Sequence, residues 1–224
     1  MNYSQTKTAN ESGFSLLELI IGMSITLAIM AIASILLASS FLIRSRENLR
    51  SSALADAQRA LNSLSRDIAN AGYGLSTNGI VAGDSGPTQI RVRSDLDLSG
   101  ATDSSDEDVK YLLINDANGS FIVRMNLQPA QTTSLLANRI DGMAIYYYDQ
   151  QVTYTVGDGV ISNVLNAGGV AQAQVTPDLA KYIVIVLKVT LPAVGTPGAP
   201  GYQPASQTQL VSTVALRNAR LQYY

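Results

Sequence analysis

The chain of 224 residues contains no cysteine and no histidine. Without cysteine it has no disulfide bond, no thiolate metal site and no cysteine nucleophile. Without histidine it has neither a Ser-His-Asp triad nor an imidazole ligand for a metal ion. Since histidine is also the side chain that most often transfers protons near neutral pH, we expect the protein not to be an enzyme.

Charged residues are scarce as well. Asp, Glu, Lys and Arg make up 14% of the chain, against about 25% in ordinary soluble domains. This deficit indicates that part of the chain lies outside water. The net charge is only −2 and no long basic run is present, so we expect no nucleic-acid partner.

One long apolar run lies near the N-terminus, where Glu18 is the only charged residue between Phe14 and Ile43. A membrane-spanning helix needs about 20 apolar residues, whereas the apolar stretch of a secretory signal peptide has only about 7–15. The run therefore predicts a single transmembrane helix. A carboxylate inside a bilayer is costly, so Glu18 is expected either to meet a partner that neutralises it or to lie at the headgroup level.

The residues at the start of this run, Gly13-Phe14-Ser15-Leu16-Leu17-Glu18, resemble the processing site of type IV prepilins and pseudopilins. The resemblance implies that a membrane peptidase cleaves between Gly13 and Phe14 and then methylates the new amine of Phe14. It also implies that Glu18 forms an assembly salt bridge with the N-terminal ammonium of a neighbouring subunit. A charge in a low-dielectric helical core is tolerable only when it is neutralised in this way.

Two further features resemble minor pilins of the PilW-like type. No proline interrupts the run from Phe14 to Ile43, and Arg66-Asp67-Ile68 is followed by Ala71-Gly72-Tyr73. The resemblance implies a minor pilin of the type IV pilus that assembles through its N-terminal helix and primes or caps the filament. The implied partners are other pilins, both major and minor, the prepilin peptidase and the pilus assembly machinery.

The implied location is the cytoplasmic membrane, crossed once with the head outside the cytoplasm, and later the pilus at the cell surface. Two alternatives remain open at this point. A J-type minor pseudopilin of type II secretion shares the same N-terminal pattern. Arg44, Arg46 and Arg50 follow the apolar run while only Lys7 precedes it, and the positive-inside rule then favours an unrelated bitopic membrane protein with a cytosolic head.

The helix is predicted to continue beyond the apolar run, although a break near Ser39-Ser40 is an alternative. Apolar residues recur at a spacing of three and four, which predicts one buried stripe on an amphipathic helix, at Leu54, Ala57, Leu61, Leu64 and Ile68. Gly72-Tyr73-Gly74 predicts the end of the helix. The expected organisation is a leader at 1–13, a transmembrane or filament-core helix at 14–43, an amphipathic helix at 44–74 and a β-rich head at 75–224.

Short apolar or alternating runs separated by Gly, Asn, Asp and Pro predict β-strands in the head, at 88–93, 109–114, 121–127, 142–148, 152–156, 182–191 and 209–216. The continuously apolar residues 183–187 predict a central strand, and Asn118-Gly119 predicts a hairpin turn. Residues 134–139 are interpreted as a short helical turn, and 192–204 as an exposed loop. The predicted fold class is α+β and pilin-like, with a long N-terminal helix packed on an antiparallel β-sheet head.

The loop from Asp95 to Asp108 concentrates carboxylates in the pattern D-x-D-x-S-G-x-x-D-x-x-D, counted from Asp95. This pattern resembles the calcium loop of an EF-hand, because Ca²⁺ takes six to eight oxygen ligands from alternate positions of a tightly wound loop. The predicted calcium ligands are Asp95, Asp97, Ser99, the carbonyl of Ala101, Asp103, and Asp106 or, after a slip of one residue, Glu107. A solvated acidic loop that binds no ion is the alternative.

Overall fold

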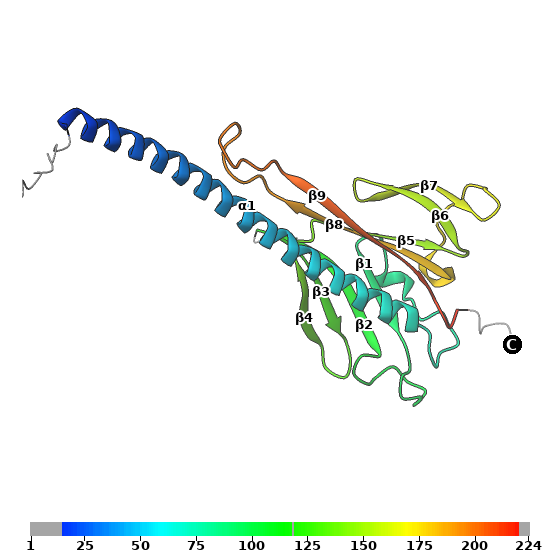
Figure 1. Cartoon of the computed structure of the whole chain (residues 1–224). Helices are drawn as coiled ribbons and strands as arrows, with labels where there is room; N and C mark the ends of the chain where they lie inside the picture. The colour runs from blue at the N-terminus through cyan, green and yellow to red at the C-terminus, as the bar shows by residue number, and fades with distance from the viewer. Residues whose placement is uncertain (1–14, 118, 220–224) are drawn as a thin grey trace, which may run out of the picture. The chain divides into compact units, whose positions relative to one another are not determined.

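The computed structural model describes residues 15–117 and 119–219. The elements within these ranges are labelled in Figure 1; they are α1 (Leu16–Asn70), η1 (Ala82–Asp84), β1 (Gln89–Arg93), β2 (Asp108–Asp116), β3 (Gly119–Asn126), β4 (Thr132–Asn138), β5 (Gly142–Tyr148), β6 (Val152–Gly157), β7 (Val160–Asn166), η2 (Pro177–Leu179), β8 (Tyr182–Leu191) and β9 (Ser206–Ala215). They fall into two compact units. The helical unit contains residues 15–45 and 194–203, and the head unit contains residues 46–193 and 204–219.

Helix α1 is continuous from Leu16 to Asn70, so the expected uninterrupted helix is confirmed and a break at Ser39-Ser40 is excluded. Hydroxyl groups inside the apolar half do not disturb it, because they donate to carbonyls three or four residues earlier. These bonds measure 2.7–2.9 Å and involve Ser24, Thr26, Ser34, Ser39 and Ser40. The helix stops where predicted, since Gly72 takes a φ of +78° and its N–H turns to the carbonyl of Arg93.

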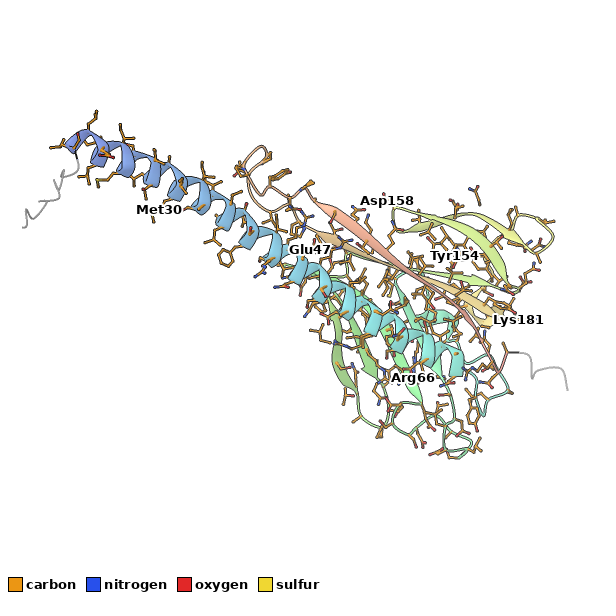
Figure 2. All side chains as sticks on the ribbon, viewed as in Figure 1. Met30, Glu47, Arg66, Tyr154, Asp158 and Lys181 are labelled. Carbon is orange, nitrogen blue, oxygen red and sulfur yellow. The ribbon has the colours of Figure 1, made fainter. Side chains whose placement is uncertain are left out.

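The first half of α1 is long and apolar enough to cross a membrane. Its large apolar side chains are exposed on every side, and Figure 2 shows them projecting all around the helix near Met30. A helix that is apolar all round is stable only when something other than water surrounds it. The helical unit therefore presents a surface that lipid or other helices must cover.

The second half of α1 belongs to the head unit and buries one stripe in its core. Its buried apolar residues recur at spacings of three and four, apart from the adjacent pair of Ala60 and Leu61, at Ala53, Ala57, Ala60, Leu61, Leu64 and Ile68. The predicted stripe is confirmed from Ala57 onwards. The prediction that Leu54 is the first residue of this stripe is wrong, because Leu54 is 38% exposed and the small side chain of Ala53 faces the core instead.

The strands form three antiparallel sheets, with the orders β1-β2-β3-β4, β5-β8-β9 and β6-β7. The α+β class with a helix packed on antiparallel strands is thus confirmed, and β8 is central in its sheet as predicted. Strand β7 was not predicted, and the helical turn expected at 134–139 is wrong. Residues 134–138 lie in β4, where backbone pairing with β3 and the strand preference of Thr132 and Thr133 outweigh any local helical tendency.

Strand β8 is buried on both faces, which explains its continuous apolar run. Ile183, Ile185 and Leu187 join the main core that contains the buried stripe of α1. Val184 and Val186 point the other way, into a second cluster shared with the β6-β7 hairpin. The same alternation in β5 buries Tyr147 in the main core and places Tyr146 against the second cluster.

Replacing Leu64 with alanine tests the packing of α1 in the head unit. Leu64 is 0% exposed, so Leu64→Ala should lower the free energy of unfolding by about 2–5 kcal/mol through lost burial and a residual cavity. Leu54→Ala is the matched control on the same helix and should cost less than about 1 kcal/mol. Urea unfolding of the full chain in detergent measures both, and equal losses would contradict this packing.

Candidate functional site

The first candidate site is the beginning of α1. The predicted cleavage residues Gly13 and Phe14 lie outside the described residues, whereas Glu18 lies in the first turn of the helix. A carboxylate at this end of a helix is stabilised by the helix dipole. Glu18 forms no ion pair with any described residue, so a partner from outside this part of the chain is needed once water is removed.

Glu18 borders a shallow groove of about 440 Å³ along one face of the helix. The groove is lined by side chains one and two turns apart, at Glu18, Leu19, Gly22, Met23, Thr26 and Leu27. Gly22 leaves open space where a side chain would stand, and the Thr26 hydroxyl is turned back to the carbonyl of Gly22 at 2.7 Å. The face is apolar apart from the carboxylate, so it suits an apolar helix that carries a positive charge at the same position along the helix axis as Glu18.

The second candidate site is the acidic loop between β1 and β2. Carboxylate oxygens of Asp95, Asp97 and Glu107 lie within 4.8 Å of one another. Asp95 and Glu107 are almost fully buried, at 2% and 1% exposure. Three negative groups at this spacing repel one another, and hard oxygen ligands in this arrangement are those that Ca²⁺ prefers.

Backbone N–H groups wrap the loop around these carboxylates. Asp95 accepts from the N–H groups of Ser99 and Gly100 at 2.9 and 2.8 Å. Glu107 accepts from Leu96 and Asp97 at 2.7 and 3.2 Å through one oxygen, and through the other from Ser104 at 2.9 Å. A carboxylate oxygen has two lone pairs, so both oxygens of Asp95 and the Glu107 oxygen bonded to Ser104 keep acceptor capacity for a further ligand, whereas the other Glu107 oxygen already accepts two hydrogen bonds.

The predicted calcium ligands are not all brought together. Asp106 turns away and forms an ion pair with Arg124 at 2.8 Å, so Glu107, the alternative with a slip of one residue, is the carboxylate beside Asp95 and Asp97. Asp103 and Ala101 are exposed. Gly100 takes a φ of +85°, which glycine adopts without strain and which allows the loop to turn sharply there. Hydrogen bonds, chiefly from the Ser104 hydroxyl and then from Ser99, lower the pKa of Asp97 to about 2, so it is ionised at neutral pH.

Beside the acidic loop lies an ion-pair network that the sequence did not reveal. Asp108 is 1% exposed and accepts from Arg91 at 2.7 Å through each oxygen and from Arg93 at 2.9 Å. Arg91 also contacts Asp84 at 2.6 Å, which in turn contacts Lys110 at 3.2 Å. Burial raises the pKa of Asp108, but the hydrogen bonds from both arginines lower it by more. This network fixes β1 and β2 where the acidic loop begins and ends.

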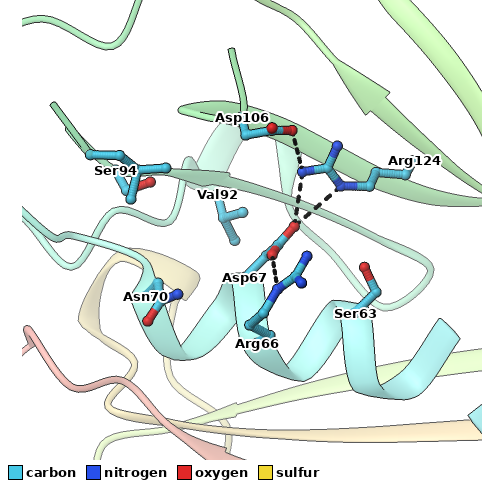
Figure 3. Close-up of a pocket in the computed structure, with 9 residues that line it drawn as sticks. Ser63, Arg66, Asp67, Asn70, Val92, Ser94, Asp106 and Arg124 are labelled. Carbon is cyan, nitrogen blue, oxygen red and sulfur yellow. Dashed lines mark hydrogen bonds and ion pairs between the residues drawn. The ribbon is translucent and has the colours of Figure 1, made fainter. Parts of the chain in front are cut away.

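A third feature is the pocket of about 390 Å³ shown in Figure 3, which lies between α1 and the strands. Asp67 accepts from Arg124 at 3.1 Å and from the hydroxyl of Tyr111 at 2.6 Å, while Arg124 also pairs with Asp106. Burial and the neighbouring Asp67 raise the pKa of Tyr111, which therefore stays protonated. Since these charges are already paired with one another, the arrangement is suited to bracing the helix against β2 and β3.

Comparison with known proteins adds no relative: no family model, no curated protein and no solved structure matches the chain. Its function must therefore be inferred from its own residues.

The calcium prediction is tested by titrating the full chain in detergent with Ca²⁺ in a calorimeter. If the loop binds the ion, heat is released with a dissociation constant of about 10⁻⁴–10⁻³ M, typical of extracellular modules. Glu107→Gln should remove the heat, because it takes away a central carboxylate. Asp116→Asn, an exposed acid outside the loop, is the control and should keep it. No heat at millimolar Ca²⁺ would identify the segment as an acidic loop without an ion.

Proposed function

We propose that the protein is a minor subunit of a type IV pilus, similar to PilW-like minor pilins, and that it assembles through its N-terminal helix and primes or caps the filament. The observation that carries the proposal is a fully exposed apolar half-helix with one carboxylate, Glu18, in its first turn. The other half of the same helix is buried in a compact β-rich head. This division suits a subunit that is anchored at one end and displays the other.

The proposed mechanism follows from the free-energy cost of burying the Glu18 carboxylate without a positive partner. Before assembly the apolar half of α1 stores the subunit in the cytoplasmic membrane. Cleavage after Gly13 then exposes a positively charged amine on Phe14, which the peptidase methylates. In a helical core of low dielectric constant the attraction between this ammonium and the Glu18 carboxylate of a neighbour is many times stronger than in water. The pair sets the axial position of the two helices while their apolar surfaces pack side by side.

A J-type minor pseudopilin would use the same mechanism in a type II secretion system, and it remains the alternative of the same class. The genes that neighbour this one separate the two, since pilus biogenesis genes support a pilin and secretion genes support a pseudopilin.

The positive-inside rule favours a cytosolic head because three arginines follow the apolar run, but one of them, Arg46, is engaged by the head itself. This residue is only 7% exposed. Its guanidinium donates to the carbonyl of Pro204 and, at 3.1 Å, to the hydroxyl of Ser206. A guanidinium engaged by the head contributes less to membrane orientation than Arg44 and Arg50, which are exposed. Arg44 and Arg50 still favour a cytosolic head, but the resemblance of Gly13-Phe14 to a prepilin processing site outweighs them, and we propose on that ground that the head lies outside the cytoplasm.

Replacing Glu18 with alanine tests the assembly role. Glu18→Ala should leave the head folded and the membrane level of the subunit unchanged, but should lower its incorporation into sheared filaments by at least about 100-fold, because the neighbour's ammonium would be buried without a partner at a cost of about 3–5 kcal/mol. Glu47→Ala, the same change on the same helix beyond the apolar run, is the matched control and should assemble normally. Immunoblots of filament and membrane fractions measure both. Normal incorporation of Glu18→Ala would remove the proposed role of this residue.

The orientation of the head is tested with protease added to intact spheroplasts. A head outside the cytoplasm should be degraded, while a cytoplasmic marker protein in the same cells survives. Protection of the head until the membrane is permeabilised would contradict the proposal and support a bitopic protein with a cytosolic head.

A further inference from the structure

The segment that joins β8 to β9 is unusual in its chemistry. We call residues 194–203 the proline loop; with its two flanks, the stretch from Pro192 to Pro204 contains four prolines and three glycines. No residue from 189 to 216 carries a charge. A loop that projects into water normally carries charged or strongly polar side chains, so this composition needs an explanation.

The proline loop is folded in a defined way. Val194 and Gln203 exchange two backbone hydrogen bonds of 2.9 Å, which close its base. Two consecutive turns follow, with the N–H of Ala199 donating to Thr196 at 3.0 Å and the N–H of Tyr202 donating to Ala199 at 3.1 Å. Much of its backbone donor capacity is thus satisfied internally, and Pro197 and Pro200 have no N–H to satisfy.

The proline loop packs against the apolar half of α1 within the helical unit. A Cβ added to Gly201 would lie 3.1 Å from the Cα of Ser39 and 3.5 Å from a methyl group of Leu42, so a side chain would crowd this approach, and the φ of +83° at Gly201 also favours glycine. Leu42 is 37% exposed, whereas the large apolar residues from Leu16 to Phe41 are 51–75% exposed. The loop therefore covers part of the helix before its first arginine, Arg44.

The proline loop contacts α1 at a distance from Glu18 that is close to the thickness of the hydrocarbon core of a bilayer. Ser39 lies 21 residues after Glu18, which is about 32 Å along a helix at a rise of about 1.5 Å per residue. The hydrocarbon core of a bilayer is about 30 Å thick. With Glu18 at one boundary of the core, the proline loop meets the helix at the other boundary, and the exposed Arg44 lies about 8 Å further on, within reach of lipid phosphates.

We propose that the proline loop is a second membrane contact, which lies in the headgroup region of the bilayer beside its own helix. An uncharged loop that satisfies half of its backbone N–H groups internally, and can donate the others to water and lipid headgroups, enters this region at little electrostatic cost. Tyr202 adds an aromatic ring of the kind enriched there. The contact holds the membrane end of α1 at one depth before assembly. The inference rests on the membrane-spanning part of the proposed function and not on filament formation.

The absence of cysteine gives a direct test, because a single introduced cysteine can be labelled with an environment-sensitive fluorophore. The full chain carrying Ala199→Cys is reconstituted at low density in vesicles of phosphatidylcholine and phosphatidylglycerol. Ala167→Cys, in an exposed loop of the head unit, is the water-facing control, and Ser24→Cys, in the apolar half of α1, is the lipid-facing control. Quenching by spin-labelled lipids is compared with quenching by aqueous iodide at each position.

We expect the label at position 199 to be quenched by shallow spin-labelled lipids several-fold more strongly than the label at 167. Equal behaviour of 199 and 167, with 24 in lipid, would overturn this inference and leave the proposed function standing. A label at 24 that iodide quenches as in water would overturn both. A label at 199 shielded from both quenchers would indicate burial against a second copy of the chain and would also contradict a lipid contact.

Discussion

The cost of placing one carboxylate in an apolar environment is the constraint on which the proposed function depends. Glu18 is the only charged residue among the described positions before Arg44, and the helix around it is exposed on all sides. At the boundary of a membrane, lipid covers the apolar side chains and headgroups and water solvate the carboxylate, but a helical core without water offers the charge no such solvation. A neighbouring subunit that supplies both an apolar helix and an ammonium group satisfies both requirements, so the proposed assembly depends on this charge pair.

The same helix meets a different environment in its second half. There most exposed positions are polar, and small residues such as Ala57 and Ala60 let the helix approach the strands closely. The ion pair of Asp67 with Arg124 braces this packing at the edge of the core, and the pair of Asp108 with Arg91 joins β1 to β2. The head is thereby built as a compact unit that includes the second half of α1.

The elements that the sequence predicted well are those with one strong periodicity. The continuous α1 and the doubly buried β8 follow directly from their apolar patterns. Strands β4 and β7 could not be recognised, because both are largely exposed and owe their conformation to pairing with a neighbour. The sequence located the acidic loop but left open whether Asp106 or Glu107 turns inward, since that choice depends on Arg124, which is contributed by a distant strand. The pairing of Asp108 with Arg91 and Arg93 could not be predicted either, because it depends on the register of β1 against β2.

The mass of the native N-terminal peptide tests the central claim most directly, because the ammonium that pairs with Glu18 exists at the right height only after cleavage. If the protein assembles as proposed, the polypeptide isolated from its own cells begins at Phe14 and carries a methyl group on its amine. A polypeptide that still begins at Met1 would contradict it, since the terminal amine would then lie 13 residues away from the apolar run.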